Sequence, residues 1–547
     1  MLLHKINHIF NIPFFYYCFL LNLVSSSVIL VNLDSLLSFF LIFTFSITFA
    51  YFETTFITLF PKIRHSLSII LIIIYNILII IDYFLLYKFD MVINNTAIDI
   101  VTVTNIREII DFTTTYISPL LLISIITIII IINVLIYKFS KYIANFKFNT
   151  FFKLLTITGI CIYLYAFSNL FLLKQDLGLS IPQYNTISRL IFSYHYIKTD
   201  KHIGELRHIC KNTKAIFNGE NKDSLTIIVV IGESHNLFHS SLYGYEKETN
   251  PLLNKRAKKG ELIIYNNAIT TQDLTSKVME SVFSLDSLGI NFNTTPLFPA
   301  CFKAADFYCA LYDNEYFKDK STYFLCNNIL SDILFDKRNT TQYEWDNDMI
   351  QDIEIVDSLR SLYIIHLVGQ HYAYNKRSPN QFKKFTIHDY ENKEASQRQT
   401  IADYDNACLY NDFVINEIIK KFEKKNACLI YFSDHGEEMY DNRNYCGHGT
   451  ARNAPDIRYQ MKIPCFIWIS EKYKHQEAQK TQQISNANNL PISTDDISHT
   501  ILDLGCISTE YFNPQRSFIN IRYNLNRQRL ILDGWDYDKI ISNYNIH

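Results

Sequence analysis

The hydrophobic residues are concentrated in the N-terminal third of the chain. Five apolar runs there are each long enough, at roughly 20 residues, to cross a bilayer core as a helix. They cover residues 12–33, 36–60, 66–87, 117–137 and 151–173. Beyond residue 173, charged and amide residues occur at the density usual for a water-soluble domain. We therefore predict a membrane domain with five spans at 1–173, a linker at 174–223 and a soluble domain at 224–547.

Two acidic residues, Glu53 and Asp82, fall inside the apolar runs. Each lies near the predicted end of a span, where a carboxylate reaches the membrane surface at low cost. We therefore expect interfacial positions for both rather than an active group within the bilayer.

Lysine and arginine in the short loops predict the orientation of the spans, because positively charged loops stay in the cytoplasm. Such residues precede the first span, separate the second from the third, and separate the fourth from the fifth: Lys5, Lys62, Arg64, Lys138, Lys141 and Lys147. The loop at 88–116 carries only Lys88 and Arg107. The N-terminus is thus expected in the cytoplasm, and an odd number of spans places the soluble domain on the other side.

Strand and helix patterns alternate in the soluble part. Three runs rich in β-branched residues are typical of strands buried in a parallel sheet: "SLTIIVVIGES" (224–234), "SLYIIHLVGQH" (361–371) and "ACLIYFSDH" (427–435). The stretch "YDNACLYNDFVINEIIKKFEKK" (404–425) has helical periodicity and ends in lysines, as a helix C-terminus often does. This alternation predicts a doubly wound α/β domain, with a mostly parallel sheet flanked by helices.

Metal-type or phosphate-type ligands follow each of the three predicted strands. Glu233 follows the first, His371 the second, and Asp434 with His435 the third. Ligands of open parallel sheets bind at the carboxyl ends of the strands. Residues in ordinary solvated loops would not be expected to place a carboxylate or imidazole at the same end of every strand. We therefore predict one shared site.

A nucleophile for that site could come from "TTQDLTSKVMESVFSL" (270–285), which carries hydroxyl groups where a helix begins. Free N–H groups at a helix start suit a phosphate. From spacing alone, Asp273 or Thr275 as a simple N-cap is the better interpretation. A threonine hydroxyl becomes a competent nucleophile when a cation lowers its pKa, as zinc does for water, to about 7.

Charge and cysteine content narrow the functional classes. A formal net charge of -2 gives no basic excess for a nucleic-acid partner. The chain has 11 cysteines, and Cys301, Cys309 and Cys326 are close enough in sequence to close a loop by a disulfide. This number and spacing of cysteines is compatible with an exported domain, where disulfides can form.

Several motifs occur in an order typical of one family: "VVIGESHNLFHSSLYGYEKETNPLL" (229–253), "LTSKVMESVFS" (274–284), "HLVGQHYAYNKRSP" (366–379), "YDNACLYNDFVINEII" (404–419), "YFSDHGEE" (431–438) and "GHGT" (447–450). In this order the chain resembles the membrane-bound phosphoethanolamine transferases of the alkaline phosphatase and sulfatase superfamily. The resemblance extends over almost the whole chain, including five spans before an exported catalytic domain. Singly, each motif would be weak.

The resemblance implies a role for individual residues. It implies one tight zinc site, held by Glu233, Thr275, Asp434 and His435, with Thr275 also the nucleophile. His371 and His448 match the histidines that hold the substrate phosphate or a second metal ion. Glu437 and Glu438 are expected to shape the loop rather than to bind the metal.

A further match lies in the loop at 88–116. The stretch "TNIREIIDF" (104–112) resembles a family segment that binds the lipid head group, and Thr104 and Glu108 would share one helix face. The family usually has an asparagine where this chain has Ile100. An amphipathic helix at the membrane interface is therefore an equal alternative.

The function implied by the resemblance is transfer of phosphoethanolamine from phosphatidylethanolamine to lipid A, a core sugar or another glycan, through a phospho-threonine intermediate. It implies a monomer in the bacterial inner membrane with a periplasmic catalytic domain. Two alternatives are a glycerol phosphate transferase of the lipoteichoic acid synthase type and an inactive membrane scaffold. A sulfatase activity is disfavoured, because no C/S-x-P-x-R motif surrounds Thr275.

Overall fold

The chain forms two compact units in the computed structural model, Met1–Thr104 with Thr113–Asp200, and Asn105–Phe112 with Lys201–His547. The structure describes residues 9–10, 12–32, 36–89, 92–94, 97–98, 101, 104, 106–116, 118–145, 149–167, 184–198, 202–219, 224–286, 294–315, 328–339, 341–357, 360–451, 453–532 and 534–543.

The first unit is helical. Its helices are α2 (Pro13–Ser26), η1 (Ser27–Asn32), α3 (Leu36–Thr58), α4 (Arg64–Phe89), α7 (Pro119–Ala144), α8 (Asn149–Phe167) and α9 (Thr186–Lys198). Among the described residues, three stretches are long and apolar enough to cross a membrane: Leu37–Thr58, Arg64–Tyr87 and Leu120–Ala144. The apolar helices at the first and fifth predicted spans are shorter. The number of spans, five, therefore stays a prediction.

Both acidic residues of the apolar runs are paired inside the first unit. Asp82 is fully buried, and Arg189 of α9 donates to its Oδ2 at 2.5 Å. Glu53 accepts hydrogen bonds from Tyr75 at 2.5 Å and from Asn22 at 2.9 Å. The interfacial position that we expected for both residues stays a prediction, but each is paired within the protein. Pairing of this kind offsets the cost of placing a charge among apolar helices.

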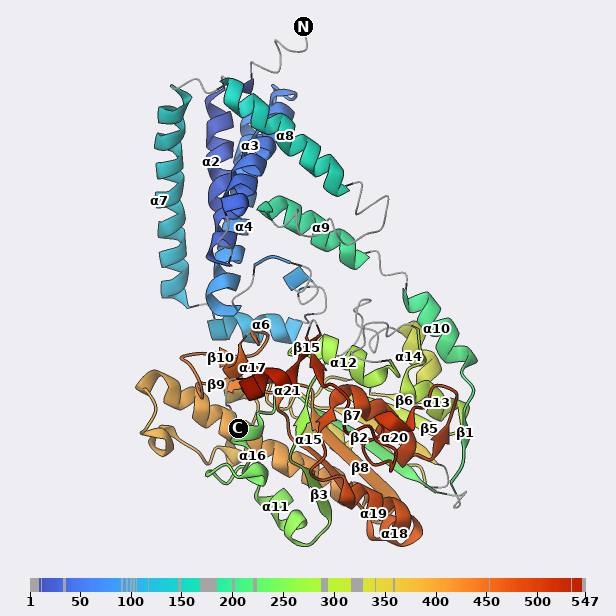
Figure 1. Cartoon of the computed structure of the whole chain (residues 1–547). Helices are drawn as coiled ribbons and strands as arrows, with labels where there is room; N and C mark the ends of the chain where they lie inside the picture. Colours follow the sequence, from blue (N-terminus) through green and yellow to red (C-terminus); the bar gives the residue numbers. More distant parts are fainter. Residues whose placement is uncertain are drawn as a thin grey trace. The chain divides into compact units, whose positions relative to one another are not determined.

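The second unit is built on a seven-stranded sheet in the order β3-β11-β8-β2-β7-β5-β6. Its strands are β3 (Leu262–Tyr265), β11 (Cys465–Ile469), β8 (Ala427–Ser433), β2 (Thr226–Gly232), β7 (Ser361–His366), β5 (Tyr308–Asp313) and β6 (Lys337–Arg338). The three strands predicted from the sequence, β2, β7 and β8, lie side by side and run parallel (Figure 1). Strand β11 runs antiparallel to both of its neighbours, so the sheet is mixed rather than fully parallel.

Helix α16 (Ala395–Phe422) covers one face of this sheet and begins nine residues before the helix predicted at 404–425. Its side chains Val414 and Ile418 pack in one buried cluster with Ile228 and Val230 of β2. Each fully buried aliphatic side chain of this kind contributes about 1.5–3 kcal/mol. Helix α20 (Ile497–Leu504) also contacts β2, and α13 (Phe298–Ala304) contacts β5. This packing fixes the strand ends that carry the candidate site.

The remaining elements of the second unit are short. Its other helices are α10 (His202–Asn212), α11 (Pro251–Lys258), α12 (Thr275–Phe283), α14 (Asn328–Leu334), α15 (Asp346–Gln351), α17 (Ala454–Met461), α18 (Glu471–Gln476), α19 (Ala478–Asn486) and α21 (Tyr537–Asn543). Its two-residue strands are β1 (Ile216–Phe217), β4 (Ala268–Ile269), β9 (Glu438–Met439), β10 (Cys446–Gly447), β12 (Ile492–Ser493), β13 (Ile507–Ser508), β14 (Leu530–Ile531) and β15 (Trp535–Asp536). Helix α6 (Ile106–Tyr116) begins in this unit.

Two of the three cysteines that are close enough in sequence to close a loop, Cys301 and Cys309, are not in a disulfide. Both thiols are buried. Cys326 lies outside the described residues. Burial raises the pKa of the Cys301 thiol to about 12, so this thiol stays protonated at neutral pH.

A buried ion pair joins the short helix η5 (Leu237–His239), which follows β2, to α16. His239 donates from Nδ1 to Oδ1 of Asp405 at 2.6 Å, and its Nε2 lies 3.5 Å from Asp441. The hydroxyls of Tyr245 and Tyr390 donate to the other oxygen of Asp405. Burial alone would lower the pKa of His239, but the two carboxylates raise it to about 10. The imidazole is therefore charged at neutral pH.

We expect His239→Gln to lower the free energy of unfolding of the second unit by about 3–5 kcal/mol, because it leaves buried carboxylates without a cation. The folded-state pKa lies above the ordinary value of 6.5, so this contribution is complete below pH 6.5 and is lost as the pH rises toward 10. Thermal unfolding of the full-length protein in detergent, compared for wild type and variant across this range, measures the effect. A difference in Tm that does not change with pH would contradict the charged pair.

Candidate active site

Thr275 is the first residue of α12, and its hydroxyl faces other side chains instead of capping the helix. The N-cap position is occupied by Leu274, which makes no side-chain hydrogen bond to the helix. The Thr275 hydroxyl donates to Oε2 of Glu233 at 3.1 Å and lies 3.4 Å from Nε2 of His435. The interpretation of Asp273 or Thr275 as an N-cap is therefore wrong.

Glu233 and Asp434 are brought together because they follow adjacent parallel strands. The backbone N–H of Asp434 donates to the carbonyl of Gly232, and Oδ1 of Asp434 accepts from the N–H groups of Ser234 and His435 at 2.9 and 2.7 Å. Its other oxygen, Oδ2, is buried and accepts no hydrogen bond from the part of the chain that the structure describes. Such a buried acceptor suits a cation.

His435 has one ring nitrogen fixed by the backbone and the other directed at the carboxylates. Its Nδ1 lies 2.9 Å from the carbonyl of Gly436, to which it donates, so Nε2 carries the lone pair. Nε2 is 3.1 Å from Oδ2 of Asp434 and 3.6 Å from Oε1 of Glu233. Ligand atoms of these three residues all lie within 4.8 Å of one another. One imidazole and two carboxylates, with a hydroxyl beside them, fit the ligand types of a zinc site.

Burial makes the charges of this cluster costly. Burial, and then the neighbouring Asp434 and Glu315, raise the pKa of Glu233 well above its usual range. Burial also acts to raise the pKa of Asp434, but His435 and several hydrogen bonds hold it below its usual value. Two carboxylates without solvent repel each other, and a divalent cation between them would remove that repulsion.

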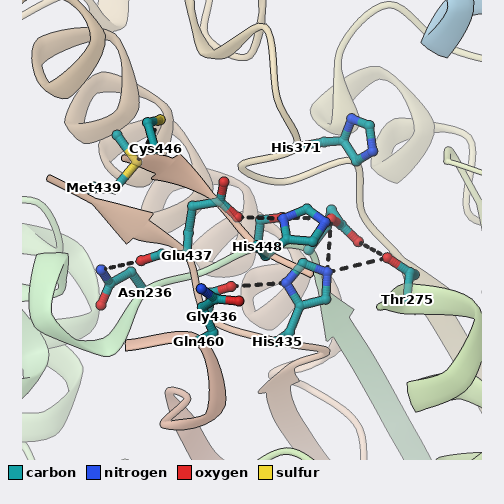
Figure 2. Close-up of polar contacts among 12 residues, drawn as sticks. Asn236, Thr275, His371, His435, Gly436, Glu437, Met439, Cys446, His448 and Gln460 are labelled. Carbon is teal, nitrogen blue, oxygen red and sulfur yellow. Dashed lines mark hydrogen bonds and ion pairs between the residues drawn. The ribbon is translucent and has the colours of Figure 1, made fainter. Parts of the chain in front are cut away.

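A second group of ligand-type side chains adjoins the first. His448 donates from Nδ1 to Oε2 of Glu437 at 2.7 Å, and Tyr374 donates to the other oxygen of Glu437 at 2.6 Å. The rings of His448 and His435 are 4.0 Å apart, and Figure 2 shows both beside Thr275. Burial alone would lower the pKa of His448, but the carboxylate of Glu437 raises it. The contact with Glu437 thus favours the protonated form of His448, whose ring lies against that of His435.

His371 belongs to a third group together with an acid that the sequence analysis missed. Ligand atoms of Glu233, Glu315 and His371 lie within 4.8 Å of one another. Glu315 follows β5, just as Glu233 follows β2, and His366 at the end of β7 lies 3.0 Å from its Oε2. The run "FYCALYDNE" (307–315) could have revealed Glu315, but it contains no β-branched residue and we did not predict a strand there.

The two residues predicted to bind the lipid head group are not tested by this geometry. Thr104 is half-buried and belongs to the first unit. The side chain of Glu108 lies outside the described residues. Their role in head-group binding stays a prediction.

The fold and the site place the chain in a known family. The sequence profile of the family described as Sulfatase matches residues 226–506, which is more than half of the 547 residues. The chain therefore belongs to the sulfatase family, within the alkaline phosphatase superfamily. This confirms the superfamily to which the ordered motifs pointed.

Several relatives of the chain are named phosphoethanolamine transferases. The chain is 30% identical over 320 residues to phosphoethanolamine transferase EptC of Escherichia coli K12, a match that covers 54% of each chain. It is 27% identical over 320 residues to phosphoethanolamine transferase CptA of Salmonella typhimurium, again covering 54% of each. The matched part thus spans about half the length of these curated relatives.

Solved structures give the same picture of the fold. The periplasmic domain of E. coli EptC matches with a TM-score of 0.53 and 28% identity, over 60% of this chain and 96% of that one. The same domain in complex with Zn matches with a TM-score of 0.51 and 27% identity, with the same coverage. The integral membrane protein EptA of Neisseria meningitidis matches with a TM-score of 0.61 and 16% identity, over 93% of this chain and 97% of that one. Among the described residues, three helices that are long and apolar enough to cross a membrane thus precede the sulfatase-type domain.

We expect Asp434→Ala to weaken zinc binding by more than about a hundredfold, because it removes a ligand from the centre of the buried cluster. Metal analysis of full-length protein after dialysis measures the retained zinc. Glu438→Gln is the matched control, because the Oε1 atom of Glu438 accepts hydrogen bonds from the backbone of Asp441 and Asn442. Equal zinc content in Asp434→Ala and wild type would contradict the site.

Proposed function

We propose that this protein transfers phosphoethanolamine from phosphatidylethanolamine to an acceptor in the bacterial envelope, which is lipid A, a core sugar or another glycan. One observation carries the proposal: the Thr275 hydroxyl lies against Glu233 and His435 at the carboxyl ends of two parallel strands. The curated relatives that share this domain are named as phosphoethanolamine transferases.

Glu233, Asp434 and His435, together with Thr275, would hold one zinc ion. When bound, zinc supplies Lewis acidity that lowers the pKa of a hydroxyl in contact with it. The protein itself holds the hydroxyl in place, since Thr275 is fixed at the start of α12 and donates to Glu233. His371 and His448 are available for a second ion or for the substrate phosphate.

In the first step, the oxygen of Thr275 attacks the phosphorus of phosphatidylethanolamine. The bond from phosphorus to the diacylglycerol oxygen breaks, diacylglycerol leaves with a proton, and phosphoethanolamine remains as an ester on Thr275. Thr275 is the first residue of α12, and a helix start favours phosphate. His448, whose protonated form is favoured by its contact with Glu437, would offset negative charge on the phosphoryl oxygens.

In the second step, an acceptor oxygen attacks the same phosphorus. Phosphoethanolamine passes to the acceptor, and the Thr275 oxygen regains its proton. Donor and acceptor are both membrane amphiphiles, so an anchored enzyme meets them at a raised effective concentration. The protein would act as a monomer.

The same proposal assigns the parts of the chain. Residues 1–173 form a five-span anchor in the inner membrane with a cytoplasmic N-terminus, 174–223 connect, and 224–547 form the periplasmic catalytic domain. The distribution of lysine and arginine in the loops supports this orientation.

We expect Thr275→Ala to reduce release of labelled diacylglycerol from phosphatidylethanolamine by at least about a thousandfold, since it removes the attacking oxygen. The full-length protein in detergent with labelled donor lipid provides the assay. Thr270→Ser is the matched control, because the Thr270 hydroxyl donates to the carbonyl of Gln272 and does not contact the cluster. Activity of Thr275→Ala close to wild type would exclude Thr275 as the nucleophile.

We expect envelope glycolipids or glycans from cells that express the protein to carry an added phosphoethanolamine mass that is absent from cells without the gene. Mass spectrometry of both fractions identifies the acceptor. An added glycerol phosphate mass would instead support the alternative transferase, and no added mass with any donor would support an inactive scaffold.

A further inference from the structure

A cavity of about 560 Å³ lies in the second unit, outside the cluster around Thr275. Its walls come from the start of α6 and from two loops of the sulfatase domain. The lining residues are Arg107, Asp111, Gln342, Tyr343, Glu344, Trp345, Asn375, Lys376, Arg377, Ser378, Pro379, Asn380 and Lys383. All of them belong to the same compact unit.

The charged groups on these walls are mostly basic. Among the described residues that line the cavity, four are basic and two are acidic: Arg107, Lys376, Arg377 and Lys383, with Asp111 and Glu344. Asp111 is buried and already accepts from Lys376 at 2.6 Å and from Arg377 at 2.5 Å. The cavity therefore keeps an excess of positive charge, which attracts an anion.

Arg377 is the deepest of these groups and is only partly satisfied. Its side chain is 3% exposed. Nε donates to the carbonyl of His371 at 3.1 Å, and Nη2 donates to the carbonyl of Tyr372 at 2.9 Å. Within the described residues, Nη1 has no hydrogen-bond partner. A buried guanidinium nitrogen left without an acceptor is costly. Arg377 lines the cavity, so an anion that reaches this nitrogen would be stabilising.

The same residue links the cavity to the candidate active site. Arg377 holds the backbone of His371, and the imidazole of His371 lies in the group with Glu233 and Glu315. An anion bound at Arg377 would therefore be positioned behind the histidine loop of the transfer site.

Helix α6 suggests what kind of molecule carries the anion. Arg107 and Asp111, four residues apart, face the sulfatase domain, where Arg107 donates to the carbonyls of Tyr343 and Glu344 at 3.1 and 3.2 Å. Ile109 and Ile110 on the same helix are 52% and 53% exposed. A helix with one polar docked side and exposed isoleucines suits a lipid surface. The anion that enters here is thus expected on a membrane amphiphile.

We propose that this cavity binds a phosphate group carried by the acceptor glycolipid and so positions the acceptor beside the His371 loop. Arginine forks and lysine ammonium groups are the side chains that recognise phosphate. The identification of the ligand as the acceptor rests on the proposed transfer function. The presence of a phosphate site in the cavity does not.

Phosphate binding is tested on full-length protein in detergent after removal of metal, so that the metal cluster does not compete for the ligand. Titration calorimetry with inorganic pyrophosphate is expected to show binding that Lys376→Gln/Lys383→Gln weakens by about tenfold or more. Both lysines are exposed, so this variant should fold. Lys255→Gln/Lys259→Gln, an exposed basic pair at another surface, is the matched control and should bind like wild type. No binding by wild type, or equal binding by the cavity variant, would overturn the proposal.

A second experiment tests whether the ligand is the acceptor. It measures the transfer of phosphoethanolamine to an acceptor glycolipid with and without its phosphate group. Removing the phosphate is expected to raise the KM of the wild type by about tenfold or more and to change that of the cavity variant far less. An equal rise in both proteins would show that the phosphate binds elsewhere and would overturn the acceptor assignment. If the wild type releases no diacylglycerol from phosphatidylethanolamine, the transfer function fails, and the pyrophosphate titration still decides whether the cavity binds phosphate.

Discussion

The structure depends on an unfavourable contact: two acidic side chains are buried together where adjacent parallel strands end. Pairing of β2 with β8 places Glu233 and Asp434 at one edge of the sheet, and both lie beneath the surface. Hydrogen bonds from the backbone satisfy only one oxygen of Asp434. Apolar packing by α16 and β2 supplies the stability that keeps these groups in place. The arrangement is strained electrostatically without a cation and becomes favourable with one.

Much of the site could be predicted because several of its residues come directly after strands of the sheet. The runs that became β2, β7 and β8 are rich in β-branched residues, and a buried parallel strand has few other sequence signatures. Glu233, Asp434 and His435 could then be placed together by topology. Thr275 and His448 could not, since neither follows a central strand of the sheet. Their placement relied on resemblance to a family, and the spacing around Thr275 by itself favoured an ordinary helix cap.

The features that were missed depend on partners distant in the sequence. β11 is as apolar as its neighbours, and its antiparallel direction depends on how the chain returns to the sheet edge. Glu315 follows a strand rich in tyrosine, cysteine and alanine, which has a weak strand pattern. The pairing of Asp82 was missed because hydropathy contains no information about Arg189, 107 residues further along the chain. In each case, tertiary packing overrode the local pattern.

The docking of residues 105–112 onto the sulfatase domain has a practical consequence for recombinant work. A soluble fragment that starts near residue 201 keeps the whole sheet and the metal-type cluster but loses Arg107 and Asp111. Lys376 and Arg377 would then lose their shared counter-ion, and the basic walls would open to water. Inhibitor screens on such a fragment would detect binding to the metal-type cluster. They would not present the complete cavity beside it, because Arg107 and Asp111 are missing. Compounds selected there would need re-ranking on the intact polypeptide.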